Sequence, residues 1–169
     1  MRHALPAAIL SLQAACMAAP APRIASAAEP AFRPEVFFAG PTRGTGTFDT
    51  VIAAPAALTV ESTGTAQPDG TFTLDQRIEI EGEAPRTRRW RIEPVGPGRY
   101  TGTLTDATGP VTLSAEGNRL SIRYTDRSGA AIEQILTLAP DGLSAHNLTK
   151  ARLLGLTVAT LDETIVRDP

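Results

Sequence analysis

The chain has 169 residues, a length typical of one domain, and 42% of them are hydrophobic. Its formal net charge of −2 argues against a nucleic-acid partner, because affinity for nucleic acid depends on basic residues that neutralise phosphates. Cys16 is the sole cysteine, which excludes an intrachain disulfide and a zinc site built from several cysteines.

Residues 1–28 have the pattern of an export signal. A short basic start is followed by the apolar residues 4–19 and then by small residues. This order predicts cleavage after Ala27 or Ala28, a location in the periplasm, and a short linker over 29–34. The apolar run falls short of the roughly 20 residues that a membrane-spanning helix needs.

A lipid anchor at Cys16 is the alternative for this segment. The sequence Leu12-Gln13-Ala14-Ala15-Cys16 resembles a lipobox, although Gln13 stands where a leucine is usual. In that case residues 17–30, which are rich in alanine and proline, would tether the domain to an envelope membrane.

From residue 35 onward the pattern alternates with period two. Residues 71–80, for example, place Phe72, Leu74, Gln76, Ile78 and Ile80 on one face and polar residues on the other. Glycine-containing turns separate such runs. We therefore predict ten strands, over 43–53, 57–66, 70–81, 86–94, 98–106, 110–115, 118–126, 130–139, 143–151 and 155–166.

Short turns between successive strands predict an antiparallel meander. Closure of a meander into a barrel removes its unpaired edges, so residues 35–169 are expected to form one all-β, up-and-down, lipocalin-like barrel.

The glycine-rich segment 36–48, VFFAGPTRGTGTF, tests this prediction. A phosphate-binding glycine loop needs a following helix, and here strand-forming residues follow. The glycines instead suit a strand where the barrel is pinched. We expect Phe37 and Phe38 to plug one end of the core, one pointing inward and the other capping from outside. Gly46 is expected either to have a positive φ or to lie against Phe37 or Phe38.

Several separated segments resemble one family in their order and spacing. They are Phe-Phe-x-Gly at 37–40, Arg-x-Trp at 88–90, Tyr-Thr-Gly at 100–102, Gly-Asn at 117–118, and Asn147 with Leu154-Gly155. Together, over about residues 34–166, they resemble the bacterial envelope lipoproteins catalogued as domain of unknown function 3833. The resemblance implies a lipocalin-like barrel with no assigned activity.

The chain departs from that family at two places besides the lipobox. Residues 132–136 read IEQIL where the family usually carries Asp-Asp-Trp-Met, and Ile122 stands where a tryptophan is usual. If these residues shape a ligand site in relatives, the site of this chain is altered.

Candidate ligand-binding residues are polar or aromatic residues on the core-facing side of the strands. Alternation places Arg88 inward beside Trp90, and it places Arg89 and Arg91 outward, where we expect them to pair with the acidic strand 79–83. A buried guanidinium needs a partner. The candidates are Arg88, Trp90, Gln76, Gln134, Tyr100, Tyr124 and Phe72, with a water-filled barrel mouth as the alternative explanation of the polar members.

We predict no catalytic residue, metal or cofactor. His146 is the only histidine after the leader and is expected to face solvent, as are Glu79, Glu81 and Glu83. The predicted function is therefore non-catalytic binding of a small apolar or amphipathic molecule or of an envelope partner. A structural envelope protein with a filled core, or less readily a cavity enzyme such as an isomerase or hydrolase, are the alternatives.

Overall fold

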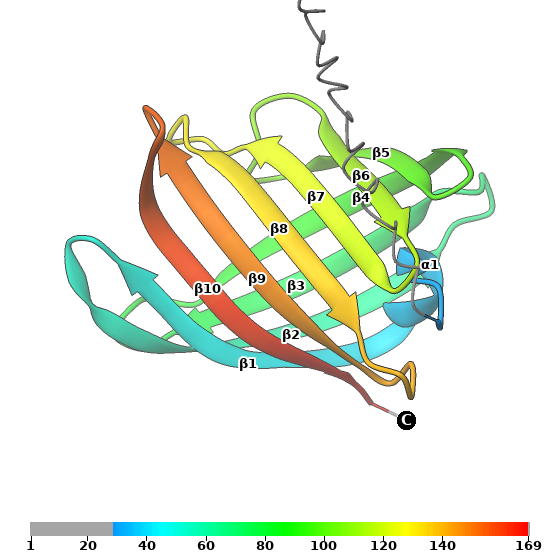
Figure 1. The fold of residues 1–169 in the computed structure, drawn as a ribbon, viewed down its shortest axis with the longest axis horizontal. Coiled ribbons are helices and arrows are strands. Elements are labelled where there is room, and N and C mark those ends of the chain that lie inside the picture. The colour runs from blue at the N-terminus through cyan, green and yellow to red at the C-terminus, as the bar shows by residue number, and fades with distance from the viewer. Residues whose placement is uncertain (1–28, 169) are drawn as a thin grey trace, which may run out of the picture.

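The computed structural model describes residues 29–168 as a closed antiparallel barrel of ten strands (Figure 1). The predicted export signal, its cleavage site and Cys16 lie outside the described residues. A one-turn helix, α1 (Pro34–Phe37), precedes the strands β1 (Gly40–Thr50), β2 (Ala53–Ala66), β3 (Phe72–Ile80), β4 (Arg86–Gly96), β5 (Arg99–Leu104), β6 (Val111–Glu116), β7 (Arg119–Thr125), β8 (Ala131–Leu138), β9 (Ser144–Leu153) and β10 (Leu156–Arg167).

Each strand pairs with the next along the chain, and β1 pairs with β10 to close the barrel. The predicted all-β barrel is confirmed, and each predicted strand overlaps an observed one. The short helix α1 was not predicted. Within residues 29–168 no helix has the length and apolar character needed to cross a bilayer.

Because the strands alternate in direction, the turns collect at two ends of the barrel. The turns β1–β2, β3–β4, β5–β6, β7–β8 and β9–β10 form one end, on the left in Figure 1. We call it the open end, because exposed residues there line the internal cavity described below. Helix α1 and the remaining turns form the other, which we call the closed end.

Three phenylalanines fill the closed end. Phe32, Phe37 and Phe38 are only 1%, 2% and 6% exposed, and their rings contact one another with centroids 4.9–6.4 Å apart. The backbone N–H of Phe32 donates to the carbonyl of Gly117 at 2.7 Å, which fastens this segment to the β6–β7 turn. The expected plug is confirmed.

The expectation that one phenylalanine caps the plug from outside is wrong. It assumed a strand, in which neighbouring side chains point to opposite faces. Instead Phe37 ends α1 and Phe38 is its C-terminal cap, so both rings turn inward. Pro34 begins the helix, as proline's fixed φ favours.

Glycines in β1 allow a close approach to β10. A Cβ at Gly46 would lie 2.1 Å from the carbonyl oxygen of Asp162 and 2.7 Å from the Cα of Glu163. Gly46 has no positive φ and lies against the backbone of β10, so both alternatives expected for it, the positive φ and the contact with Phe37 or Phe38, are wrong. The phenylalanine plug makes its close contact elsewhere, at Gly64, whose Cβ would lie 1.9 Å from the carbonyl oxygen of Phe38.

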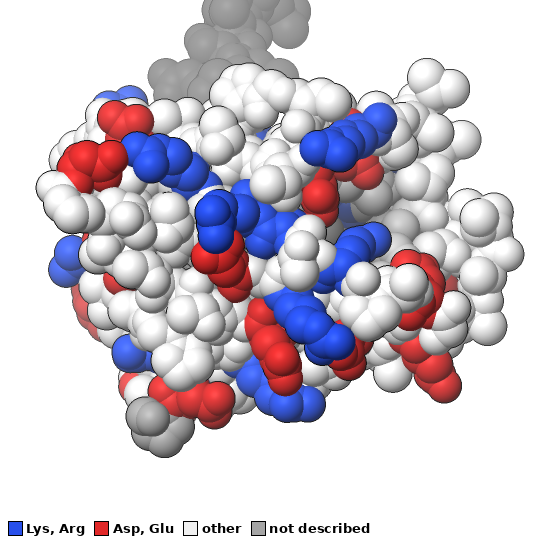
Figure 2. Space-filling model, turned by 180° about the vertical axis from the view of Figure 1, so that it is seen from behind, with Lys and Arg blue, Asp and Glu red and all other residues white. Residues whose placement is uncertain are grey.

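Ion pairs cover part of the outer face. Arg89 pairs with Asp75 at 2.5 Å and Arg91 with Asp69 at 2.7 Å across β3 and its preceding turn. Figure 2 shows basic and acidic side chains interleaved on the face behind that of Figure 1.

The expected pairing of these arginines with strand 79–83 is only partly right. The neighbouring strand is correct, but the register opposes Arg89 to Asp75 and Arg91 to Thr73. Glu79 pairs with Arg77 on its own strand instead. Glu81 and Glu83 lie in the β3–β4 turn, and no group of metal-ligating side chains occurs among residues 29–168.

Candidate ligand-binding site

The barrel encloses a cavity of about 520 Å³, within the ~300–1,000 Å³ range usual for small-molecule sites. Its walls are mainly apolar. At the open end the exposed residues Arg127 and Ser128 line it, so the cavity reaches the surface there. At the closed end Phe38 and Pro34 form part of its floor.

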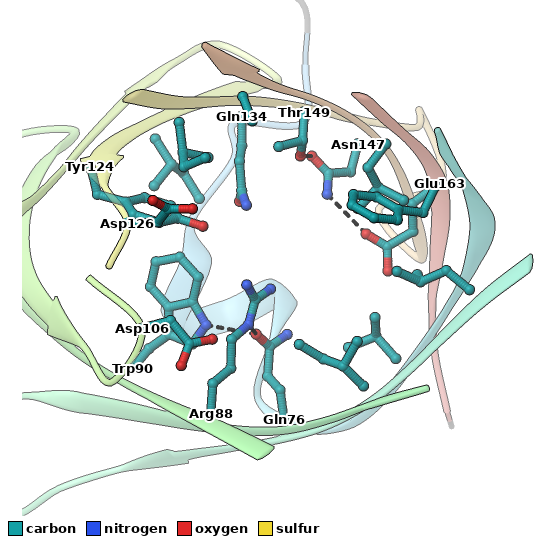
Figure 3. Close-up of a pocket in the computed structure, with 18 of the residues that line it drawn as sticks. Gln76, Arg88, Trp90, Asp106, Tyr124, Asp126, Gln134, Asn147, Thr149 and Glu163 are labelled. Atoms are coloured by element: carbon teal, nitrogen blue, oxygen red, sulfur yellow. Dashed lines mark hydrogen bonds between the residues drawn. The ribbon is translucent and has the colours of Figure 1, made fainter. Parts of the chain in front are cut away.

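Two hydrophobic clusters line the cavity at different depths. The closed-end cluster contains Phe38, Leu74 and Trp90, and the open-end cluster contains Leu58, Val60, Ile78 and Ile80. Polar side chains from five strands point into the cavity between these two clusters (Figure 3). We call them the polar belt: Gln76, Arg88, Gln134, Asn147, Thr149 and Glu163.

The strand register assembles the polar belt from pairs. Gln76 of β3 opposes Arg88 of β4, and Gln134 of β8 opposes Thr149 of β9. Because side chains alternate between the two faces of a strand, each member shares the inward face with at least one apolar neighbour two residues away.

Gln76 organises the first part of the belt. Its Oε1 accepts hydrogen bonds from Nε of Arg88 at 2.7 Å and from Nε1 of Trp90 at 2.6 Å. Its Nε2 donates to Oγ of Ser62 at 3.0 Å. The Arg88 guanidinium lies 5.3 Å from the centroid of the Trp90 ring, a cation–π arrangement. The hydrogen bond to Gln76 and the cation–π contact with Trp90 therefore hold Arg88 against the cavity wall.

Glu163 forms the second part of the belt. The carboxyl group is buried, the residue being 4% exposed, and its Oε2 accepts a hydrogen bond from Nδ2 of Asn147 at 2.9 Å. Burial raises the pKa of Glu163, while the Asn147 hydrogen bond and the charge of Arg88 oppose the rise. Gly44 makes room for this group, since a Cβ there would lie 1.8 Å from Oε1.

Gln134 is the third part. It is 6% exposed, points into the cavity, and makes no hydrogen bond with the other residues drawn in Figure 3. Buried amides normally have partners, so an unpaired one that faces a cavity is available to a guest molecule.

Tyr124 lies beside the belt. Its ring packs edge-on against Trp90, with centroids 5.8 Å apart. Burial raises the pKa of the Tyr124 hydroxyl, and the charge of Arg88 opposes this rise. The hydroxyl therefore stays a neutral donor and acceptor through the physiological range.

The cavity gathers five of the seven residues that the sequence nominated: Arg88, Trp90, Gln76, Gln134 and Tyr124. Phe72 and Tyr100 do not line it. Phe72 is buried in the closed-end cluster. The Tyr100 hydroxyl donates to Oε2 of Glu35 at 3.1 Å, and burial followed by the nearby charge raises the pKa of Tyr100 to about 12.

Sequence reasoning missed Glu163, Asn147 and Thr149. A signal was present, because Glu163 lies two residues from both Leu161 and Ile165 and so shares their face. His146 faces solvent as expected, and its Nε2 lies 2.7 Å from Asp162 on the outer face. The outward position of His146 itself requires Asn147 to point inward.

Fold and cavity together define a closed, up-and-down antiparallel barrel with an internal, partly polar chamber. The sequence model of one family, described as a protein of unknown function (DUF3833), matches residues 10–135. The chain therefore belongs to the DUF3833 family. No curated protein matches the sequence.

Two solved structures share the fold at low sequence identity. The S-type phycobiliprotein lyase CPES from Guillardia theta is 10% identical, with a TM-score of 0.60 over 80% of this chain and 90% of that one. A protein of unknown function from the DUF3598 family of Nostoc punctiforme is 12% identical, with a TM-score of 0.57. That match covers 84% of this chain and about half, 51%, of the Nostoc protein.

Ile122 and Gln134, at two of the positions where we expected the chain to depart from its family, both line the cavity.

Proposed function

We propose that the barrel is a non-catalytic binding protein for a small amphipathic molecule, which it holds in the internal cavity. The observation that carries this proposal is the combination of a 520 Å³ chamber with mainly apolar walls and a polar belt across its middle. A purely apolar guest would leave the buried polar groups unpaired, and a purely polar one would leave the apolar walls unused.

The structural alternative, a barrel with a filled core, fits the cavity less well. Side chains normally fill the interior of a small barrel, and voids larger than a water molecule are few in proteins. The open end also provides a route by which a guest can enter.

The enzyme alternative has less support from the cavity lining. Among residues 29–168 that lining includes one buried carboxylate, Glu163, and neither histidine nor cysteine. The other two carboxylates of the lining, Asp106 and Asp126, are only partly buried, so the described lining lacks the two desolvated carboxylates that this kind of acid–base catalysis uses.

Equilibrium titration with N-phenyl-1-naphthylamine, an uncharged environment-sensitive dye, tests the proposed binding. Trp90 is the only tryptophan and lines the cavity, so its fluorescence reports occupancy without a label. We expect saturable binding of one dye per chain, with a matching change in Trp90 emission.

A matched pair of variants locates the dye. Val60→Phe adds a ring inside the open-end cluster, and Thr63→Phe adds the same ring at an exposed position of β2. Val60→Phe should weaken binding and Thr63→Phe should not. Absence of saturable binding by the wild type would reject the binding function in favour of a structural role.

We also propose that the barrel works outside the cytoplasm, in the periplasm or attached to an envelope membrane. The support is the order of basic, apolar and small residues over 1–28. N-terminal sequencing of protein from its own cells should find Ala28 or Glu29 first. A lipidated Cys16 at the N-terminus would replace the soluble form with the anchored one, and an intact Met1 would reject export.

A further inference from the structure

We infer that Arg88 binds the carboxylate of a single-chain amphiphile, whose hydrocarbon chain lies along the apolar walls of the cavity. This inference rests on the proposed binding function and specifies the chemical class of the ligand. It follows from the contacts of Arg88, from the unpaired Gln134, and from the charges that face the chamber.

The guanidinium is held in place but is not neutralised. Arg88 uses its Nε for Gln76, and its terminal nitrogens point into the cavity (Figure 3). Within residues 29–168 no carboxylate forms an ion pair with it, although ion pairs are frequent on the outer face. A guanidinium offers two parallel donors that match the two oxygens of a carboxylate.

Three carboxylates of the described chain line the cavity, Asp106, Asp126 and the buried Glu163, and none of them forms an ion pair with Arg88. Glu163 is engaged elsewhere. Its carboxyl group hydrogen-bonds Asn147 and sits in the space left by Gly44. Glu163 and Arg88 form no ion pair. The belt therefore contains a fixed cation whose charge the protein itself does not pair, and a partly buried charge of this kind favours an anionic guest.

Gln134 supplies an independent second contact. Gln134 is only 6% exposed, its side chain points into the chamber, and it lies on β8, across the cavity from Arg88 on β4 (Figure 3). An amide N–H donates to carboxylate oxygens as readily as a backbone N–H does. A head group between β4 and β8 would give both groups the partners that they lack.

The remaining lining suits one hydrocarbon chain. Leu58, Val60, Ile78 and Ile80 form a continuous apolar cluster on the open-end side of the belt. Each methylene buried there adds favourable hydrophobic free energy, so the hydrocarbon chain supplies affinity while Arg88 selects the head group.

Three ligands with one chain length and different head groups test this inference: dodecanoate, dodecanol and dodecylammonium. Each ligand is titrated into the purified protein at concentrations below the critical micelle concentration of that ligand, in competition with N-phenyl-1-naphthylamine. We expect dodecanoate to bind roughly tenfold or more tightly than dodecanol, as a charge-assisted hydrogen bond predicts, and dodecylammonium to bind most weakly.

Two arginines on the same strand provide matched variants. Arg88→Gln removes the inward charge, and Arg89→Gln removes an outward one that pairs with Asp75. Arg88→Gln should abolish the preference for dodecanoate over dodecanol, and Arg89→Gln should keep this preference. Arg88→Lys, which retains the charge but not the paired donors, should restore part of it.

Glu163→Gln provides a readout that does not depend on altering Arg88. It removes the second ionisable group of the belt and keeps an acceptor for Asn147, so selectivity for dodecanoate should stay the same or increase. A decrease would place the head group at Glu163 and overturn the inference.

The wild type alone separates the two proposals. Equal affinity for dodecanoate and dodecanol, or preference for dodecylammonium, would overturn the role of Arg88 while the binding function stands. Failure of the dye and of all three amphiphiles to bind would reject the binding function itself.

Discussion

The two ends of the barrel differ in how far their large apolar side chains are buried. At the closed end Phe32, Phe37 and Phe38 are almost completely buried. At the open end Ile52 in the β1–β2 turn and Leu154 in the β9–β10 turn are 92% and 96% exposed. The same barrel thus has one end that packs as a protein core and one that does not.

This difference separates stability from access. At the closed end the three rings pack against one another, and the backbone N–H of Phe32 donates to Gly117 of the β6–β7 turn. These contacts stabilise the barrel at the end through which a guest need not pass. The exposed apolar side chains of the open end do not pack in this way, and the cavity reaches the surface there. Burial of the exposed side chains would have required a plug that also blocked the chamber. Changes at the two ends should therefore have different consequences.

The largest expected effect comes from truncation at the closed end. Phe37→Ala should lower the free energy of unfolding by about 3–5 kcal/mol, because it removes a buried ring that does not line the cavity and leaves a void. Ile52→Ala, the matched change at the open end, should stay within about 0.5 kcal/mol of wild type. Urea unfolding followed by Trp90 fluorescence measures both.

Similar losses in these two variants would remove the distinction between the ends. A small loss in Phe37→Ala would mean that the plug is not part of the cooperative core, and a large loss in Ile52→Ala would mean that the β1–β2 turn has a partner in solution.

The second prediction concerns the seam between β1 and β10, which runs from one end to the other. Gly46→Val should cost roughly 1–3 kcal/mol or more, because its Cβ would overlap backbone atoms of β10 that cannot rotate away. Thr47→Val places the same side chain at the neighbouring, exposed position and should be nearly neutral. Thermal melts compare them.

The same thermal melts, repeated with millimolar phosphate, test whether the glycines of β1 bind an anion. If the glycines of residues 40–46 served a phosphate, millimolar phosphate would stabilise the wild type and not Gly46→Val. We expect no phosphate effect in either protein, and a wild-type melting temperature in Gly46→Val would contradict the close contact with β10.

The sequence was sufficient to predict the barrel but only part of the site. Period-two alternation fixes which side chains face inward, so Arg88 and Gln76 could be recognised as polar residues on apolar faces. The alternation does not show how far along the barrel axis, between the open and the closed end, an inward-facing side chain lies. Phe72 and Tyr100 face inward as Trp90 does, but they lie toward the closed end, beyond the cavity. Depth depends on strand register across the barrel, which no single strand reveals.

Other features escaped prediction for local reasons. Helix α1 is one turn long, too short to show a 3.6-residue period. Glu163 was overlooked because acidic residues usually mark an outer face, although its neighbours Leu161 and Ile165 point inward. Its burial depends on Gly44 of a strand more than a hundred residues away in sequence, and such pairing is visible only once the barrel closes.

The third prediction concerns Glu163, which lies between the two ends. Burial raises its folded-state pKa above the ordinary value of 4.5, so the native state binds the proton more tightly than the unfolded state. The stabilisation is complete below the unfolded pKa and is lost as pH rises through the folded pKa. Wild type should therefore lose stability relative to Glu163→Gln from about pH 4.5 upward, by at most ~1.4 kcal/mol per pH unit.

Glu133→Gln is a control with the opposite sign. Hydrogen bonds from Arg123 and Arg152 lower the pKa of Glu133 on the outer face. Wild type should gain stability relative to this variant as pH rises through the unfolded pKa, and the effect should be small because solvent screens exposed ion pairs. Melting temperatures across a pH series test both slopes. Parallel slopes for the two variants would contradict the burial of Glu163.

The smallest expected effect comes from relieving strain at the open end. Leu154 has a φ of 51°, in the left-handed region that leucine rarely adopts, and it is followed by Gly155 with a φ of 83°. Asparagine followed by glycine favours this pair of conformations in a two-residue hairpin turn. Leu154→Asn should therefore raise the free energy of unfolding by up to about 1 kcal/mol, since the side chain gives up no burial and the left-handed conformation becomes less costly.

Leu156→Asn is the control. It also removes an exposed leucine, 72% exposed, but Leu156 lies in β10 and outside the left-handed region, so this change should not stabilise the barrel. Urea midpoints of the two variants separate strain from simple loss of an exposed apolar side chain. Equal shifts would show that backbone strain at residue 154 is not the cause. A loss of stability in Leu154→Asn alone would show that this leucine packs against something in solution, and the open end would then resemble the closed end more than the comparison assumes.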